Sequence, residues 1–258
     1  MKKMIFTAFA CAFFAACINT GSVNSVSTQA DTIQPQSVEP EINPVFKSWK
    51  AGVKLSEDDV TTFGFEKCFS FVKIPDSVFA RMYNKSFPEN CSVERDSLRY
   101  LKVLHYNKEG EILTGEMVCN VKIAADLIRI FSELFSKKYP IEKMRLIDDY
   151  GADDEISMTD NNSSCFCFRT VAGSNDLSLH ALGMAVDINT LYNPYVRTKN
   201  GKQIIQPLNG KPYCDRSKTF DYKINPNDDC CKIFKKYGFL WGGDWGPYKD
   251  YQHFYKKK

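Results

Sequence analysis

The clearest pattern of hydrophobic and polar positions lies in the middle of the chain. Over residues 97–106 apolar and polar side chains partly alternate, residues 107–110 carry the turn-forming sequence Asn-Lys-Glu-Gly, and residues 115–121 are again rich in β-formers. This arrangement predicts a β-hairpin. The apolar spacing becomes helical over residues 123–137, which predicts an amphipathic helix that ends before Pro140.

Shorter patterns continue this mixture of elements toward the C-terminus. A helix is predicted at residues 228–237, closed by Gly238. Strands are predicted at residues 144–147, 165–171, 185–188 and 254–255. Because helices and strands follow one another without a regular βαβ rhythm, we expect an α+β fold with a small, mostly antiparallel sheet flanked by helices.

Three further segments show no such periodicity. Residues 45–96 scatter Phe, Trp and Pro among charges, and we expect an irregular lead-in that packs on the core. Residues 153–162 are acidic and polar, and a loop beside a substrate cleft is favoured over a Ca²⁺ loop because the EF-hand spacing is missing. Residues 189–196 are expected to form another loop that shapes the cleft.

The N-terminus has the pattern of a bacterial export signal. Residues 1–17 start with two lysines after Met1, continue with an apolar run too short to span a membrane, and end in Phe-Ala-Ala-Cys, which resembles a lipobox. We expect lipidation at Cys17, with ordinary cleavage and a soluble secreted product as the alternative. Residues 18–44 are polar and lack aromatic residues, which predicts a disordered tether. The expected location is the cell envelope, with a lipid anchor in the membrane.

Composition narrows the possible partners. An apolar content of 43% supports a real core, so a single domain is expected from residue 97 to residue 258 behind the lead-in. The net charge is +3 and no basic stripe is present, so nucleic-acid binding is not indicated. We expect the protein to act as a monomer.

Eight cysteines lie outside the leader, at positions 68, 91, 119, 165, 167, 214, 230 and 231. An even number in an exported chain permits disulfides, although the sequence does not give their pairing. No C-x-x-C spacing occurs, which disfavours both a four-cysteine zinc site and a redox lipoprotein.

The candidate chemistry rests on two of the three histidines. His180 lies in a segment that ends at Asp187, and Asp250 precedes His253 by three positions, whereas His105 stands apart. Each residue taken singly is most simply structural. Together, two imidazoles and one carboxylate form a ligand set that suits catalytic Zn²⁺ and leaves a position for water. The spacing rules out the helical H-E-x-x-H arrangement, so separate elements must supply the ligands.

These residues resemble a known family. Ser178-x-His180-x-x-Gly183-x-Ala185-x-Asp187, followed by an acid three positions before a histidine, is similar to the zinc D-Ala-D-Ala carboxypeptidase and L-alanyl-D-glutamate endopeptidase family, in its VanY-like and endolysin-like branch. The small residues in this segment suit close packing around a metal. The resemblance covers roughly residues 97–255 and implies a D-Ala-D-Ala carboxypeptidase/hedgehog-like fold with the zinc site on the sheet.

The resemblance also implies roles for individual residues. His180, Asp187 and His253 would bind zinc. Asp250 would be the general base, a position often held by Glu in the family, and Arg169 matches the upstream arginine that faces the substrate.

The segment Trp241-Gly242-Gly243-Asp244-Trp245 resembles the approach to the last ligand in the endolysin-like branch. We expect Ser178 and Asp244 to orient the ligand histidines. Asp244 is also the competing candidate for the base, but the three-residue offset from the last histidine favours Asp250.

The implied function is hydrolysis of an amide bond in the peptides of peptidoglycan. Two bonds remain open: the terminal D-Ala-D-Ala bond and the L-Ala-D-Glu bond near the glycan, which the Gly-Gly-Asp-Trp segment favours. One departure from the family is Tyr255, where His-Phe-Glu is common. This departure motivates the alternative, a catalytically inactive zinc-containing lipoprotein that binds the cell wall.

Overall fold

The computed structural model describes residues 42–171 and 174–257. The predicted signal peptide, the lipidation site at Cys17 and nearly all of the predicted tether lie outside the described residues. Among the helices that are described, none combines the length and the apolar character needed to cross a membrane.

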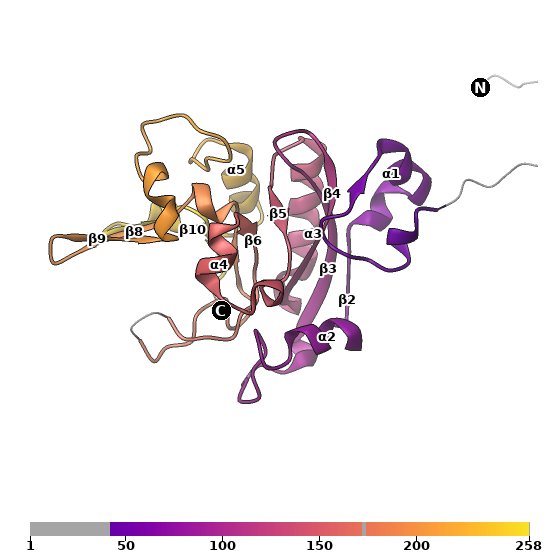
Figure 1. The fold of residues 1–258 in the computed structure, drawn as a ribbon, viewed down its shortest axis with the longest axis horizontal. Helices are drawn as coiled ribbons and strands as arrows, with labels where there is room; N and C mark the ends of the chain where they lie inside the picture. The colour runs from indigo at the N-terminus through magenta and orange to yellow at the C-terminus, as the bar shows by residue number, and fades with distance from the viewer. Residues whose placement is uncertain (1–41, 172–173, 258) are drawn as a thin grey trace, which may run out of the picture. The chain divides into compact units, whose positions relative to one another are not determined.

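The predicted hairpin is the centre of a four-stranded antiparallel sheet with the order β1-β4-β3-β2. It consists of β3 (Leu98–Tyr106) and β4 (Ile112–Asn120), and Figure 1 shows it next to α3 in the middle of the view. The turn forms because the Asn107 side chain accepts a hydrogen bond from Glu111 N at 2.9 Å and Gly110 takes a φ of +77°. The prediction is confirmed, except that the second strand begins earlier, at Ile112.

The predicted helices are confirmed and pack together. α3 (Val121–Ser136) buries its apolar face against the sheet, and the Asn120 side chain caps it by accepting from Lys122 N. α5 (Asp229–Lys236) is capped by Asp228 and is followed by Gly238 at a φ of +80°. Edge-to-face packing of Phe131 and Phe234, with ring centroids 6.3 Å apart, joins the two helices.

Residues 45–96 contribute Val45, Phe46 and Leu55 to the hydrophobic core, and they are not irregular. They contain α1 (Glu57–Phe63), α2 (Asp76–Met82), β1 (Lys54–Leu55) and β2 (Ser70–Val72). Both strands pair with the hairpin and extend the main sheet on either side. Each helix spans about two turns and each strand at most three residue pairs, so no periodicity could show in the sequence.

The C-terminal half contains short elements that form three further sheets. β5 (Lys143–Met144) and β6 (Asn162–Ser163) form a parallel pair, and the helix α4 (Asp154–Thr159) lies between them in the sequence. β10 (Leu240–Trp241), β12 (His253–Tyr255) and β7 (Ala185–Asp187) form one antiparallel sheet. β11 (Tyr248–Asp250), β8 (Tyr195–Lys199) and β9 (Lys202–Gln206) form another. The α+β class is confirmed, although several small antiparallel sheets take the place of a single one.

Four local predictions in this half are wrong. The acidic segment that was expected to be a loop forms α4, and residues 189–196 lead into β8 rather than forming only a loop. Only the first residue of the expected strand 144–147 is in a strand. Residues 165–171 form no strand because successive backbone N–H groups reach different partners: those of Phe166 and Cys167 donate to Val118 O and His180 O.

Candidate metal centre

Two of the proposed ligands lie opposite each other on paired strands. The antiparallel register of β7 and β12 places His253 directly opposite Asp187. Directly opposed side chains in such a pair lie on the same face of the sheet. His180 comes from the turn that precedes β7. The sheet thus brings two residues 66 positions apart into contact, and the expected placement of the site on a sheet is confirmed.

The donor atoms of these three side chains converge. His253 Nδ1 lies 2.9 Å from Asp187 Oδ1, His180 Nε2 lies 3.2 Å from Asp187 Oδ2, and the two imidazole nitrogens are 3.1 Å apart. All three residues are buried, and one donor atom from each lies within 4.8 Å of the others. Two nitrogens and one carboxylate are a donor set of catalytic zinc sites. The residues present therefore fit such an ion.

The main chain fixes the direction of the His180 ring. Its Nδ1 lies 2.7 Å from the carbonyl oxygen of Cys165, which can only accept a hydrogen bond. Nδ1 therefore carries the proton, and a neutral imidazole turns the lone pair of Nε2 toward His253 and Asp187. An outer hydrogen bond of this kind is usual for a metal-binding histidine. The sequence offered no signal for this contact because a carbonyl has no residue identity.

Gly183 holds the turn that carries His180. Its N–H donates to His180 O at 2.9 Å, its carbonyl accepts from Asn120 N at 2.9 Å, and its φ is +64°. A Cβ at this position would lie 2.6 Å from Asn120 N. The glycine is needed for close approach to the start of α3, rather than for packing around a metal as the sequence had suggested.

The electrostatics of the cluster favour an ionised carboxylate. Burial alone would raise the pKa of Asp187, but when the imidazoles of His180 and His253 carry a second proton, their attraction and hydrogen bonds outweigh burial and hold that pKa well below its usual range. A carboxylate that stays ionised in a buried site is ready to bind a cation.

Asp250 has a different environment, although it lies only three residues before His253. Burial of its carboxyl raises its pKa to about 7, and the charge of Asp187 acts in the same direction, while His253 and Arg169 oppose the change. Asp250 Oδ1 is buried and accepts no hydrogen bond from any described residue. A carboxyl with a raised pKa and a free oxygen suits a group that exchanges protons.

The Gly-Gly-Asp-Trp segment makes room for Asp250. A Cβ on Gly242 would lie 2.6 Å from Asp250 O and 2.8 Å from Asp250 Cβ. A Cβ on Gly243 would meet the Trp241 ring at 2.3 Å. Gly242 therefore allows the turn after β10 to approach Asp250 of β11, and Gly243 leaves room for the Trp241 ring. Gly242 is part of the motif quoted from the sequence, but its contact with Asp250 was not predicted. The adjacent glycines in the motif were the signal for it.

Arg169 lies near this carboxyl. Its positive charge lowers the pKa of Asp250, and its carbonyl accepts a hydrogen bond from Ser178 N at 3.0 Å, two residues before His180. Its Nε forms an ion pair with Asp154 Oδ2 at 2.5 Å, and both side chains are about one-third exposed. The unpredicted helix α4 supplies this partner.

The two residues expected to orient the histidines lie in different places. Ser178 Oγ accepts a hydrogen bond from His180 N at 3.2 Å, so it holds the backbone of the ligand rather than its ring. Asp244 is half-exposed and forms an ion pair with Lys235 Nζ of α5 at 2.7 Å. Among the described residues, no hydrogen bond links Asp244 to either ligand histidine.

Tyr255, the departure from the family pattern, lies beside a ligand without disturbing it. Its ring stacks on His253 with centroids 5.4 Å apart, and its hydroxyl accepts a hydrogen bond from Trp245 Nε1 at 3.2 Å. Trp245 also contacts His253, with centroids 5.5 Å apart. These two aromatic rings confine the imidazole.

The eight cysteines outside the leader are all free thiols. Six of them are buried, and burial raises the pKa values of these six thiols. Buried thiols of this kind act as small apolar core residues.

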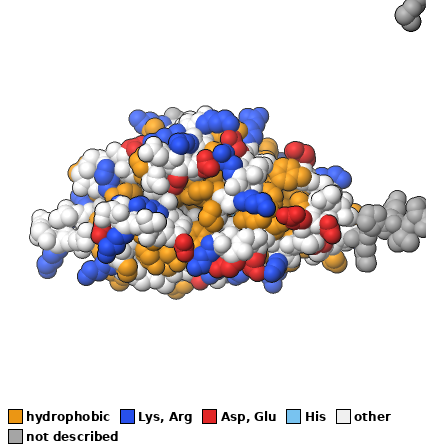
Figure 2. Space-filling model, turned by 90° about the horizontal axis from the view of Figure 1, so that it is seen from above, with side chains coloured by type: hydrophobic (Ala, Val, Ile, Leu, Met, Phe, Trp, Pro, Cys, Tyr) orange, Lys and Arg blue, Asp and Glu red, His pale blue; other side chains and the backbone are white. Residues whose placement is uncertain are grey.

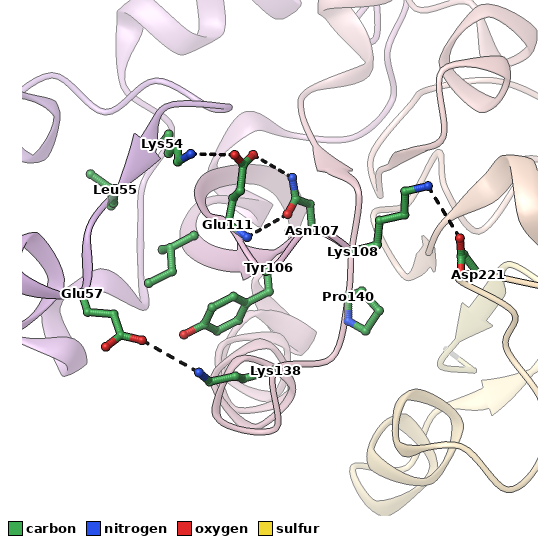
Figure 3. A pocket seen from close by; sticks show the side chains of 12 residues that line it. Lys54, Leu55, Glu57, Tyr106, Asn107, Lys108, Glu111, Lys138, Pro140 and Asp221 are labelled. Atoms are coloured by element: carbon green, nitrogen blue, oxygen red, sulfur yellow. Dashed lines mark hydrogen bonds and ion pairs between the residues drawn. The ribbon is translucent and has the colours of Figure 1, made fainter.

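One cavity among the described residues lies away from the metal centre. It has a volume of about 570 Å³ and lies between β1, the β3–β4 turn and the end of α3. Figure 3 shows that the lysines around it are paired with carboxylates: Lys54 with Glu111, Lys138 with Glu57, and Lys108 with Asp221. Its charges are neutralised locally, so it offers no free charge to a ligand.

Comparison with protein families identifies one match. Residues 172–256 match the family described as D-alanyl-D-alanine carboxypeptidase. This confirms the family resemblance for the segment that holds His180, Asp187, Asp250 and His253, but not for the expected range back to residue 97. Comparison with curated proteins and with solved structures gave no significant match.

Proposed function

From the match of residues 172–256 to this peptidase family, we propose that the protein is a zinc peptidase that hydrolyses an amide bond in the stem peptides of peptidoglycan. The observation that carries the proposal is the convergence of His180, Asp187 and His253, with the carboxyl of Asp250 beside them. A structural metal site needs no adjacent proton acceptor, whereas hydrolysis does.

The metal would be held by His180 Nε2, His253 Nδ1 and the carboxylate of Asp187. When bound, zinc supplies a Lewis acid that polarises the scissile carbonyl and makes water more acidic. The outer contacts of His180 and His253 keep both rings in the orientation that binding requires.

The chain's own groups provide the proton transfers. Asp250 accepts a proton from the attacking water at its free Oδ1 and gives it to the departing amine. Arg169 stabilises the negative charge that develops on the carbonyl oxygen. Asp154 binds one edge of the guanidinium and leaves the other edge for the substrate.

Among the two candidate bonds we favour the L-Ala-D-Glu bond. A carboxypeptidase needs a cation for the terminal carboxylate of its substrate. Arg169, whose charge lowers the pKa of Asp250, is already paired with the Asp154 carboxylate, which would repel a second carboxylate. An endopeptidase has no terminal carboxylate to bind at this position.

Export and membrane attachment are part of the same proposal. A lipid at Cys17 and the polar segment after it would hold the enzyme near the cell wall that contains its substrate.

The test is digestion of purified muropeptides by the zinc-loaded protein, with products identified by mass spectrometry. Release of the stem peptide from D-Glu onward would establish the endopeptidase, and loss of a single terminal alanine would establish the carboxypeptidase. No cleavage by a protein with stoichiometric zinc would contradict the proposal and support the inactive wall-binding protein.

The control for this test is Asp250→Ala. We expect a loss of kcat on the order of 10²- to 10⁴-fold, the usual contribution of a general base, with zinc still bound. Zinc content is measured by atomic absorption on the same samples. Joint loss of zinc and activity would show that Asp250 is a ligand or a structural residue instead.

A further inference from the structure

We propose that Ser86 and Asp148 position Arg169 for the reaction, which makes residues 76–87 part of the active site although they lie outside the family match. We call residues 76–87 the α2 segment, because it begins with α2 (Asp76–Met82) and continues into the turn that follows. The inference rests on the proposed function, in which Arg169 stabilises the developing negative charge, and it states how that residue is held in place.

The main chain around Arg169 is held on two sides. Phe168, the residue before it, donates its backbone N–H to Ser86 O at 2.9 Å. The carbonyl of Arg169 accepts a hydrogen bond from Ser178 N at 3.0 Å, two residues before the candidate ligand His180. The arginine therefore lies between the α2 segment and the segment that carries a metal-binding side chain.

Ser86 is fixed by a buried contact with the 3-10 helix η4 (Ile147–Tyr150). Its backbone N–H donates to Asp148 Oδ1 at 3.0 Å, and the Lys85 side chain donates to Asp148 O at 3.0 Å. Ser86 is fully buried, and Asp148 is 3% exposed. Movement of this turn would leave a buried donor and a buried acceptor without partners, which is unfavourable. The position of Ser86 is therefore well defined.

The stretch of chain that holds Ser86 also holds the guanidinium of Arg169. After η4 and three intervening residues the chain enters α4, whose first residue, Asp154, forms the ion pair with Arg169 Nε at 2.5 Å. Asp148 thus sets the main chain next to Arg169 through Ser86, and Asp154 sets the side chain. Because both constraints come from residues 147–159, the arginine has a defined position relative to this stretch.

Ion pairs fix α2 itself against the main sheet. Arg81 donates two hydrogen bonds to the carboxylate of Glu116 in β4, at 2.6 and 3.0 Å, and one to Asp149 of η4 at 2.8 Å. Glu116 is 1% exposed and also accepts from the Tyr100 hydroxyl at 2.6 Å. A buried carboxylate with a bidentate arginine partner connects α2 firmly to β4. Figure 1 shows α2 at the lower end of this sheet.

Apolar packing joins the α2 segment to the chain just before Arg169. Val78 and Met82 of α2 are buried in one hydrophobic cluster with Phe166. The rings of Phe87 and Phe166 have centroids 6.1 Å apart. The segment therefore contacts the stretch that carries Arg169 through side chains as well as through a backbone hydrogen bond.

The general charge of the surface does not account for the position of Arg169. On the face that Figure 2 shows, Lys and Arg side chains are interspersed with Asp and Glu side chains. A mixed surface of this kind produces no strong field of one sign. We therefore attribute the position of the guanidinium to the local contacts described above.

The test is a double-mutant cycle on muropeptide cleavage by the zinc-loaded full chain. Asp148→Ala removes the acceptor for Ser86 N, and we expect kcat to fall on the order of tenfold, since small displacements of an active-site group have large effects. The loss should appear in kcat more than in KM, because Arg169 acts on charge that develops in the transition state. Zinc content should stay unchanged.

The cycle shows whether the effect passes through Arg169. In an Arg169→Ala background, Asp148→Ala should change kcat by less than about twofold, because no guanidinium remains to be positioned. Asp148→Asn keeps an oxygen that accepts from Ser86 N, so it should retain most of the activity. Equal effects of Asp148→Ala in both backgrounds, or a wild-type kcat in Arg169→Ala, would overturn the inference.

A second variant and a control separate positioning from a general loss of structure. Lys85 is exposed, so Lys85→Ala should fold while it loses the contact with Asp148 O. It replaces Asp148→Ala in the cycle if that variant does not fold, and an effect that is absent or independent of Arg169 would then overturn the inference.

The control is Asp59→Ala, which removes a carboxylate that caps α1 in the same part of the chain by accepting from Ser56 N at 2.8 Å. It should keep the wild-type kcat. A loss of kcat as large as that in Asp148→Ala would show that any weakening of residues 45–96 has the same effect, and would contradict the specific role of Asp148.

Failure of the proposed function has a different signature. If the wild type cleaves no muropeptide, hydrogen exchange of the Phe168 amide is measured by NMR, relative to the amides of β3 in the same protein. Faster relative exchange of the Phe168 amide in Asp148→Ala than in Asp59→Ala would still support the positioning of this stretch. Equal relative exchange in the two variants would reject it.

Discussion

At the scale of single residues, glycines decide the geometry of the site. The ligands and the general base are reactive side chains, but the positions of His180 and Asp250 each depend on a neighbouring glycine. Gly183 brings the turn of His180 against Asn120, and Gly242 brings the turn after β10 against Asp250. Glycine is used where one backbone must approach another closely.

Replacement of Gly242 by Ala should therefore impair catalysis without removing zinc. The added Cβ would lie 2.6 Å from Asp250 O, so the carboxyl must move. We expect kcat to fall at least about tenfold, since displacement of a catalytic group by about 1 Å has large effects. Gly246→Ala is the control, because a Cβ there meets nothing within 4 Å. Equal kcat values in both variants would refute this account.

Gly183→Ala should affect both stability and zinc affinity. The variant combines a φ of +64° with a contact of 2.6 Å to Asn120 N. Gly151→Ala has a similar φ of +68° but open space around it, so it isolates the backbone cost, about 1–2 kcal/mol. Chemical denaturation and competitive zinc titration compare the two. A Gly183 variant as stable as the Gly151 variant, with wild-type zinc affinity, would contradict this prediction.

At the scale of elements, the long hairpin and α3 form the structural scaffold, and the short elements around them carry the site residues. His105 of β3 is part of this scaffold. Its Nδ1 donates to Ile141 O at 2.6 Å, and the side chain is buried. Burial lowers the pKa of His105 to about 4, and the charge of Arg145 adds to this effect.

This lowered pKa predicts a loss of stability in acid. In the unfolded chain His105 binds a proton near pH 6.5, whereas in the folded protein it stays neutral down to about pH 4. Its contribution is therefore intact above pH 6.5 and falls as the pH drops to 4, by about 3 kcal/mol in total.

The check is urea denaturation of the wild type and of His105→Asn between pH 7 and pH 4. Asn retains a donor for Ile141 O but does not titrate in this range. As the pH falls, the unfolding free energy of the wild type should decrease relative to that of His105→Asn. A difference that stays constant with pH would disprove the role of His105.

At the scale of the whole molecule, the metal should link the two halves of the catalytic segment. Asp187 and His253 sit on different strands, and His180 sits in a turn, so an ion bound by all three joins three places in the chain. Ligands that bind only the folded state stabilise it by mass action.

Removal of zinc should consequently lower the melting temperature. At a free zinc concentration of 100 times Kd, the stabilisation is about 2.7 kcal/mol. Calorimetric scans with zinc and with chelator measure it, and His180→Ala is the control in which the two scans should coincide. Coincident scans for the wild type would show that the cluster does not hold zinc under these conditions.

The sequence by itself determined the parts of this protein that depend on local patterns. The hairpin, α3 and α5 each have enough residues to display a period and a cap, so these elements were predicted within a few positions. The ligand candidates His180, Asp187 and His253 were found because a motif fixes residue types and spacing, and the structure brings them together.

Only the tertiary structure decided how these parts become a site. The Cys165 carbonyl orients His180, Gly242 admits Asp250, and α4 supplies Asp154 to Arg169. Asp244, which sequence reasoning placed beside the histidines, pairs with Lys235 instead. Each of these contacts joins residues that lie in separate elements of the fold. A local sequence pattern cannot show which distant backbone or side chain a residue will contact, because folding decides it.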